Sequence, residues 1–405
     1  MTDTAREPRY AWVAVWACFV ALATIFGVSY SFAAFFTSLS EAFDARRADV
    51  SLVFGLSGLV YFVFGAGAGM LADRFGPRLV CSLGMLFIAC GLIASSWATS
   101  MWAIYAAYGV GIGVGIALVY TPAIACVQPW FTRRRGLAAG IASAGIGAGT
   151  VVVPLAATLL IAALQWRGAM QWLAAGVLLF GLGSTLLLKR APSATAAPGA
   201  AVSGHTLRQA LRSSDFRWMY LAVVLASPSM FIPFAHVSAA ARDLGVSDGQ
   251  AVGLVGLIGI GSLVGRFAIG ALADRLGRPL TLALSQASMG LAYLAWAGAD
   301  GYVAMVWFSL WIGLSYGGIV SLLPALCMDL FGARAVSSII GTLYTAAAFG
   351  NLLGPWIAGA LFDALHSYAL VIWGCLGLSV LATAATWKLV RRVSKASGFG
   401  RPAPR

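Results

Sequence analysis

One arginine of this 405-residue chain occupies a place where a charged side chain is costly. Arg266 lies inside an apolar run long enough to cross a membrane, and it is the only charged residue well inside such a run. An arginine at the centre of a membrane helix costs about 2.5–3.5 kcal/mol on insertion scales. A guanidinium that faces an internal cavity can bind a carboxylate through two parallel N–H···O hydrogen bonds. Arg266 is therefore predicted to anchor an organic anion; the alternative is a side chain that extends about two turns to the membrane surface.

Two tyrosines in other apolar runs can add neutral hydrogen-bond donors. Tyr120 stands two residues before Pro122, and Tyr344 lies in the eleventh apolar run. Each hydroxyl can donate to a carboxylate while its ring forms part of a cavity wall. The alternative for both is packing at a helix interface. Tyr30 and Asn351 are further candidates for contact with a bound anion.

The elements that must position these residues are transmembrane helices. The chain is 60% hydrophobic and only 10% charged, which excludes a soluble domain, where about 25% of residues are charged. A β-barrel needs alternating segments of about ten residues, whereas 169–188 is continuously apolar. An all-α membrane protein is expected. The predicted spans are residues 11–36, 48–72, 78–97, 100–128, 136–164, 168–189, 216–241, 249–273, 279–299, 302–330, 336–363 and 368–390.

The basic residues predict the orientation of these spans. Of the 26 Lys and Arg residues, 21 fall at the chain ends or in the connections on the same side as the ends. The positive-inside rule then places both termini in the cytoplasm. We expect a multi-pass protein of the plasma membrane (the inner membrane if the source is bacterial), surrounded by lipid. No short cleavable signal is expected before the first span.

A long polar connection divides the chain into two similar parts. Residues 190–215 are rich in Ala, Pro, Gly and Ser and predict a flexible cytoplasmic linker. It separates an N-terminal six-helix bundle, 1–189, from a C-terminal six-helix bundle, 216–405, with a basic tail. The parts align at a shift of 201 residues, since GMLADRFGPRL at 69–79 matches GALADRLGRPL at 270–280. Parallel repeats with an even number of spans predict a binding site between them, near the membrane midplane.

Several classes of chemistry lack their residues in this sequence. The six cysteines form no C-x-x-C pair or cluster with histidine, which argues against a metal or a disulfide. No phosphate-binding G-x-x-x-x-G-K-[ST] motif occurs, and no pair of carboxylates lies inside the spans. We therefore expect no enzyme activity, no cofactor and no metal. The net charge of +13 is attributed to membrane orientation and not to nucleic acid. The working unit is expected to be a monomer.

The repeated sequence G-x-L-A-D-R-x-G-x-x resembles the cytoplasmic loop signature of the major facilitator superfamily. The resemblance implies a fold of two pseudo-symmetric six-helix bundles and a transport function. It also implies that the loop carboxylates and the arginines beside them act as conformational latches; these residues are Asp73, Arg74, Arg78, Asp274, Arg275 and Arg278. The alternative is that they are ordinary loop charges that set topology.

A narrower resemblance concerns the monocarboxylate porters and the related oxalate/formate porters. WFTRRRGLAAGIASAGIGAG at 130–149, SYSFAAFF at 29–36 and GSLVGRFAIG at 261–270 are similar to that group. The resemblance puts Arg266 on the group's substrate-anchoring arginine. It also implies that His236 faces the cavity, where it can bind substrate or carry a proton; the alternative is a hydrogen-bonded structural histidine.

The sequence also departs from both groups. The animal carriers have an aspartate and a lysine where this chain has Ser262 and Ala34, and oxalate-type porters have a lysine on the eleventh helix that is missing here. We therefore expect a secondary transporter of a small monocarboxylate such as lactate or pyruvate, with proton symport; uniport and exchange stay open. The alternative within transport is export or exchange of another organic anion or a drug-like solute. A receptor that binds without transport is a further alternative.

Overall fold

The computed structural model describes residues 9–127, 130–131, 135–190, 204–332 and 335–396. Almost all of these residues are helical, and strands are absent from the described part of the chain. The first half contains α1 Arg9–Phe43, α2 Arg47–Phe75, α3 Pro77–Ser96, α4 Met101–Ile104, α5 Gly113–Val127, α6 Arg135–Gly176 and α7 Gly183–Thr185. The second half contains α9 Ser214–Asp243, α10 Asp248–Leu276, α11 Arg278–Ala297, α12 Tyr302–Phe331, α13 Val336–Leu365 and α14 Ala369–Ala396. The short α8, Leu207–Arg212, lies between the halves in sequence.

The predicted spans correspond to these helices. Ten stretches are long and apolar enough to cross a membrane, and the longest, Gly140–Thr185, contains two predicted spans. It breaks at Gln165, where φ is 62° and ψ is 167°. Helix α11 is not among the ten, because its buried face carries polar residues such as Gln286, but it occupies the predicted span 279–299. A π-helical stretch, Tyr105–Ile112, joins α4 to α5, and Val177–Leu182 joins α6 to α7.

The sequence repeat is also a structural repeat. Helices α2 and α10 begin and end 201 residues apart, and so do α3 and α11. The turns between them are built alike: Gly76 has φ 94° and Gly277 has φ 85°, a conformation that favours glycine. Each of these glycines donates its N–H to the carbonyl four residues earlier, at 2.8 and 2.9 Å. Gln165 and His366, with φ of 62° and 49°, mark the same break in the two halves.

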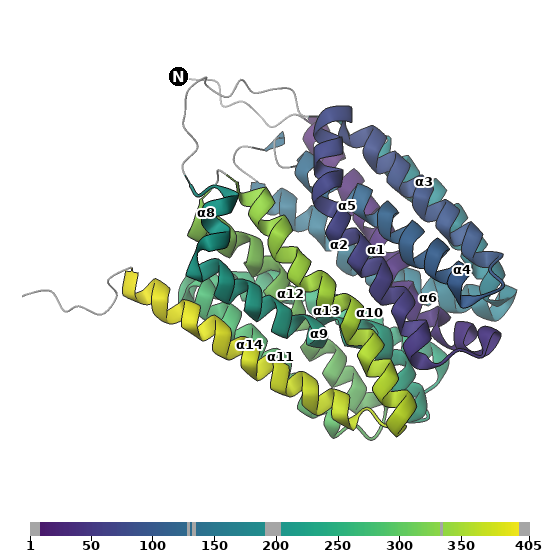
Figure 1. The fold of residues 1–405 in the computed structure, drawn as a ribbon. Helices are drawn as coiled ribbons and strands as arrows, with labels where there is room; N and C mark the ends of the chain where they lie inside the picture. The colour runs from purple at the N-terminus through teal and green to yellow at the C-terminus, as the bar shows by residue number, and fades with distance from the viewer. Residues whose placement is uncertain (1–8, 128–129, 132–134, 191–203, 333–334, 397–405) are drawn as a thin grey trace, which may run out of the picture.

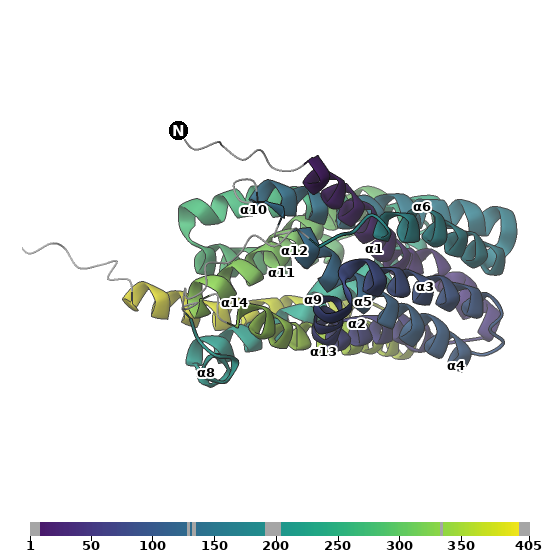
Figure 2. The same ribbon diagram turned by 90° about the horizontal axis from the view of Figure 1, so that it is seen from above.

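The two halves lie side by side, each with its helices running between two faces. The start of α1, the end of α14 and α8 lie at one end of the molecule, called here the linker face (Figure 1). The α1–α2, α9–α10 and α13–α14 connections lie at the opposite end, called the far face. The halves meet along two seams, α2 against α13 and α6 against α10. Figure 2 shows these seams at opposite edges of the molecule.

Small residues let the helices approach closely along both seams. A Cβ added to Gly58 of α2 would lie 1.5 Å from Nδ2 of Asn351 on α13. At the positions related by the repeat, a Cβ on Gly259 of α10 would lie 2.9 Å from Cβ of Thr150 on α6. Glycine is therefore required for this approach, as in other closely packed membrane helices. The two seams are thus built from equivalent positions of the 201-residue repeat.

Part of the predicted linker has its own structure. Helix α8 begins with a capping box in which Thr206 and Gln209 bond each other's backbone N–H. Just before it, Gly204 forms a backbone bridge with Gly332, beside the end of α12. The linker is therefore anchored to the second half from residue 204 onward. Residues 191–203 of the predicted linker lie outside the described residues.

Candidate substrate-binding site

A cavity lies between the two halves, and every helix that meets the seams contributes to it. Its lining is predominantly aromatic and aliphatic, with a single charged side chain. The lining residues are Phe26 of α1, Tyr61 and Phe62 of α2, Tyr120 of α5, Ile146 of α6, Val223, Met230 and Phe231 of α9, Arg266 of α10, Tyr316, Val320 and Leu323 of α12, and Tyr344 and Ala347 of α13. Its position between the repeats is the one predicted from the sequence.

Aromatic rings form a continuous wall around this space. The ring of Phe26 stands edge-on to Tyr120 at 5.2 Å and to Tyr61 at 6.3 Å between centroids. Across the seam, Phe62 contacts Phe231 and Tyr344, each at 5.9 Å. Such pairs prefer tilted or edge-to-face geometry, which fixes the orientation of the rings. The wall therefore presents a mainly apolar surface to the cavity.

Arg266 is directed into the cavity by the way α10 packs. At the preceding residue, a Cβ on Gly265 would lie 2.1 Å from the carbonyl oxygen of Leu314, so α10 is pressed against the α12 backbone. The arginine next to it lines the cavity and is half-buried. Within the described residues, Arg266 forms neither an ion pair nor a hydrogen bond. Its five N–H donors are therefore available to an anion.

Tyrosine hydroxyls supplement the guanidinium. Among the described residues, the hydroxyls of Tyr61, Tyr120 and Tyr344 form no hydrogen bond. The hydroxyl of Tyr316 lies 3.4 Å from that of Tyr30. A carboxylate held by Arg266 can thus accept additional hydrogen bonds from neutral donors. Because the lining residues include no carboxylate, nothing in the wall competes for the guanidinium.

Three of the residues predicted from the sequence come together in this cavity, and Tyr30 lies next to it. Arg266, Tyr120 and Tyr344 are lining residues. The ring of Tyr30 stacks on Phe234 at 4.2 Å between centroids, and Phe234 in turn contacts the ring of Tyr316 at 5.2 Å. The sequence thus pointed to Arg266, Tyr120 and Tyr344, but not to the other two tyrosines of the lining, Tyr61 and Tyr316.

His236 lies away from the cavity lining, contrary to the prediction. Its ring is fully buried in the seam nearer the far face. Nε2 lies 2.8 Å from the carbonyl oxygen of Pro355 and 3.0 Å from Oγ of Ser51, and Nδ1 lies 3.0 Å from the hydroxyl of Tyr368. The polar contacts of the ring are taken by protein groups, because the seam closes around it.

Asn351 also lies in the seam and not in the lining. It is 1% exposed, and its Nδ2 donates to the carbonyl oxygens of Phe54 and Gly55 at 3.5 and 3.3 Å. These carbonyls belong to α2 of the opposite half. The Asn351 amide therefore joins the two halves beside Gly58. Its side chain is used in this contact and does not line the cavity, where the sequence had predicted it.

The predicted latch residues lie on the linker face. Asp274 and Arg275 are exposed in the last turn of α10, and Asp274 forms no ion pair within the described residues. Arg278 pairs instead with Asp329 near the end of α12, a residue 51 positions away in the sequence. In the first half, Arg74 and Arg78 are exposed, and the side chain of Asp73 lies outside the described part of the structure.

The amino-acid sequence did not point to Tyr61, Tyr316 or the phenylalanines of the wall as lining residues. One signal for Tyr61 exists, because the repeat offset of 201 pairs it with Ser262, one turn before Arg266. No comparable signal marks Tyr316, which stands among apolar residues on α12. An isolated tyrosine in a span carries no indication of which neighbour it faces.

Two helical halves related by a repeat, with a central cavity at their junction, are typical of membrane transporters. In sequence comparisons, the Major Facilitator Superfamily matches residues 17–355. The chain belongs to this superfamily.

Individual relatives are monocarboxylate transporters. Monocarboxylate transporter 13 of Bos taurus is 30% identical over 362 residues, covering 89% of this chain and 84% of the relative. Monocarboxylate transporter 3 of Rattus norvegicus is 31% identical over 376 residues, covering 90% and 76%. Monocarboxylate transporter 12 of Homo sapiens is 27% identical over 423 residues, covering 95% and 82%. The chain is thus a transport protein and not an enzyme.

The position of His236 predicts a structural effect of its substitution. We expect His236→Asn to lower the free energy of unfolding by about 1–3 kcal/mol, because buried partners such as the Pro355 carbonyl lose their hydrogen bond. Thermal unfolding of the purified protein measures this, with His366→Asn as the matched control, since His366 is exposed and asparagine tolerates its left-handed conformation. An unchanged unfolding midpoint for His236→Asn, combined with lost anion binding, would contradict the structural role.

Proposed function

We propose that this protein moves a small monocarboxylate, such as lactate or pyruvate, across the membrane by alternating access. The observation that carries the proposal is the Arg266 guanidinium, which lines the cavity between the halves and forms no ion pair within the described residues. A carboxylate bound there compensates a charge that is otherwise costly at this depth. The tyrosine hydroxyls of the wall add neutral donors around the same anion.

The composition of the cavity supports one carboxylate for each substrate molecule. Arg266 is the one cation among the lining residues, so a second carboxylate would find no partner there. The rest of the lining is aromatic or aliphatic and suits the short carbon body of a lactate-like acid. The names of the relatives, monocarboxylate transporters, agree with this substrate class.

We further propose the topology that the basic residues indicate. Both termini and the linker face lie in the cytoplasm, and the far face is external, with a bundle on each side of the linker 190–215. The protein works as a monomer in the plasma membrane. The loop arginines and aspartates beside Gly76 and Gly277 act as latches on the cytoplasmic side.

Proton symport is the proposed coupling. The lining residues contain no acidic side chain that could carry the proton. The proton then travels with the substrate carboxylate or through His236, which faces Ser51 across the seam. Uptake that does not respond to an imposed proton gradient would indicate uniport or exchange instead.

A second candidate function is export or exchange of a larger organic anion or a drug-like solute. The aromatic wall around Phe26, Phe62 and Phe231 supports it, because such surfaces bind many apolar bodies. Transport of that kind would depend on ring contacts and would be insensitive to substitution of Arg266. The charge dependence of transport therefore separates the two candidates.

Substitution of Arg266 tests the proposal. We expect Arg266→Ala to abolish saturable uptake of labelled lactate and pyruvate into proteoliposomes, because the anion loses the one cation among the described lining residues. Arg266→Lys should retain weak uptake, since an ammonium keeps the charge but lacks the bidentate geometry. The control is Arg217→Ala, an exposed arginine at the start of α9. Undiminished uptake by a folded Arg266→Ala protein would exclude the anion-anchor role.

Removal of a single hydroxyl from the cavity wall should weaken binding. Hydrogen bonds to charged groups contribute about 1.5–3 kcal/mol, so we expect Tyr61→Phe to lower substrate affinity roughly tenfold or more while leaving the ring in place. Tyr302→Phe, at the start of α12 and outside the lining, is the matched control. Isothermal titration with lactate measures both. Equal affinities for the two variants would mean that Tyr61 contributes only its ring.

A further inference from the structure

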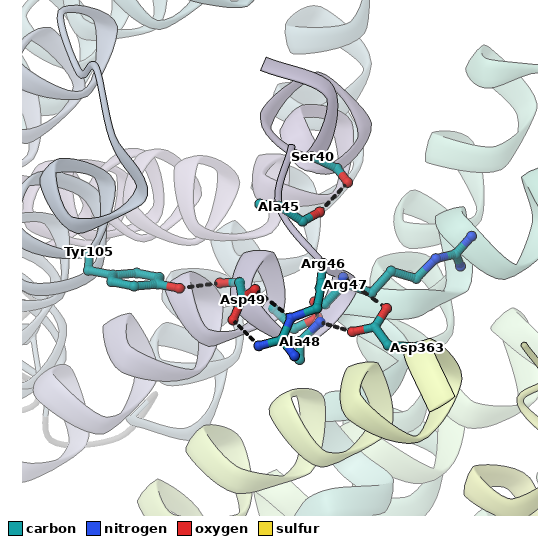
Figure 3. A network of polar contacts seen from close by, with 9 residues as sticks. Ser40, Ala45, Arg46, Arg47, Ala48, Asp49, Tyr105 and Asp363 are labelled. Carbon is teal, nitrogen blue, oxygen red and sulfur yellow. Dashed lines mark hydrogen bonds and ion pairs between the residues drawn. The ribbon is translucent and has the colours of Figure 1, made fainter. Parts of the chain in front are cut away.

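On the far face, the first turn of α2 is held by a carboxylate of the opposite half. Oδ1 of Asp363 accepts from the N–H of Arg47 at 3.1 Å, and Oδ2 accepts from the N–H of Ala48 at 3.0 Å (Figure 3). The first N–H groups of a helix have no partner within it and form the positive end of its dipole. The N-cap residue of α2, Arg46, provides no side-chain cap. The second half therefore caps a helix of the first.

The side chain of Arg47 adds a second tie across the seam. Nη1 and Nη2 donate to the two oxygens of Asp243 at 2.9 and 2.7 Å, a bidentate pair. The guanidinium also lies 3.8 Å from the ring centroid of Phe362. The side chains of Arg47 and Asp243 are 22% and 37% exposed, so the pair is partly shielded from solvent. Phe362 and both carboxylates belong to the second half.

A layer of buried polar groups lies directly behind this arginine. Nη1 of Arg47 donates to the Tyr368 hydroxyl at 2.9 Å, and that hydroxyl lies 3.0 Å from Nδ1 of His236. The Pro355 carbonyl beside Nε2 can only accept, so Nδ1 of a neutral His236 ring accepts from the Tyr368 hydroxyl. His236 then carries its own hydrogen on Nε2, toward the Pro355 carbonyl. These hydrogen bonds extend the contact between the two halves from Arg47 at the far face toward the interior.

These ties are confined to one seam and to one side of the cavity. The repeat offset places Ala162 at the position of Asp363 and Ala42 at that of Asp243, so the α6–α10 seam has no equivalent charges. In the described part of the chain, the hydrogen bonds between the halves extend from the Tyr30–Tyr316 contact to the far face. Toward the linker face, the described residues show none.

We propose that Asp363 and Asp243 hold the start of α2, with Arg47, as a latch that keeps the far face closed. The inference rests on the proposed alternating-access function and adds the residues that set the balance between its two states. When the far face opens, the N–H groups of Arg47 and Ala48 exchange Asp363 for water, and Arg47 exchanges Asp243 for water. Loss of the carboxylates therefore shifts the population toward the state open at the far face.

The test measures access to the seam directly, without any substrate. A reporter, Ser51→Cys, lies beneath the latch and contacts His236 of the opposite half. It is introduced into the full-length protein in nanodiscs, where both faces are reachable, and its rate of labelling by a hydrophilic maleimide is measured. The same protein without the reporter corrects for labelling of the six natural cysteines. Thermal unfolding verifies that each variant is folded.

Asp363→Ala combined with Asp243→Asn is expected to raise the labelling rate of the reporter roughly tenfold or more, since charge-assisted hydrogen bonds are lost. Arg47→Gln leaves the backbone N–H groups of residues 47 and 48 bonded to Asp363, so it should give a smaller rise in the labelling rate. This variant replaces the double variant if the latter does not fold. The matched control is Asp248→Asn, on the same face, because Asp248 pairs with Arg242 inside the second half. Ser51→Cys should be labelled at the same rate with Asp248→Asn as without it.

Two results would overturn the latch. One is an unchanged labelling rate in folded variants that lack the carboxylates; the other is an equal rise in Asp248→Asn, which would reduce the effect to surface charge. The measurement is separate from the transport assay. Faster labelling of the carboxylate variants, together with no lactate uptake by the wild type, would support the latch and reject the proposed substrate. Unchanged labelling of these variants, together with normal uptake by the wild type, would reject the latch alone.

Discussion

The positive charge of Arg266 in the middle of a membrane helix is the constraint on which the arrangement of the site depends. Hydrocarbon does not solvate a guanidinium, and the described residues offer it no counter-ion. The charge is tolerable only beside a cavity, where an anion or water can reach it. The cavity in turn must lie where two bodies meet, so that its contents can be released to either side. A buried arginine at this position therefore requires a cavity, and the junction of the two halves provides one.

The scaffold of this transporter is symmetric, but its chemistry is not. The repeat gives α2 and α10 equal lengths, equivalent glycine turns and equivalent close contacts along the two seams. At the same offset, however, Arg266 corresponds to Gly65 and Tyr344 corresponds to Ser143. The second half thus supplies the charge and the hydroxyls of Tyr316 and Tyr344, while the first half supplies the hydroxyls of Tyr61 and Tyr120. The repeat provides the framework, and the residues that differ between its copies provide the candidate binding site.

The sequence was sufficient for the fold because apolar length and repetition specify helices and their order. The twelve predicted spans, the repeat offset and the exceptional position of Arg266 all follow from residue type and spacing. The direction in which a side chain points is different, because helices that are apolar on every side give no periodic signal for an inward face. Tyr61 and Tyr316 were missed for this reason, and His236 and Asn351 were predicted in the cavity although they close a seam. Asp363 and Arg47, separated by 316 residues, could be paired only by the tertiary structure.

The central claim is that Arg266 recognises the carboxylate of the substrate, and a thermodynamic cycle tests it most directly. Binding of pyruvate and of its neutral amide, pyruvamide, is measured by isothermal titration for the wild type and for Arg266→Ala. If Arg266 binds the carboxylate, the wild type prefers pyruvate by about ten- to a hundredfold, the range expected for charge-assisted hydrogen bonds, and this preference disappears in the variant. A preference for the carboxylate that survives in a folded Arg266→Ala protein would exclude this role of Arg266.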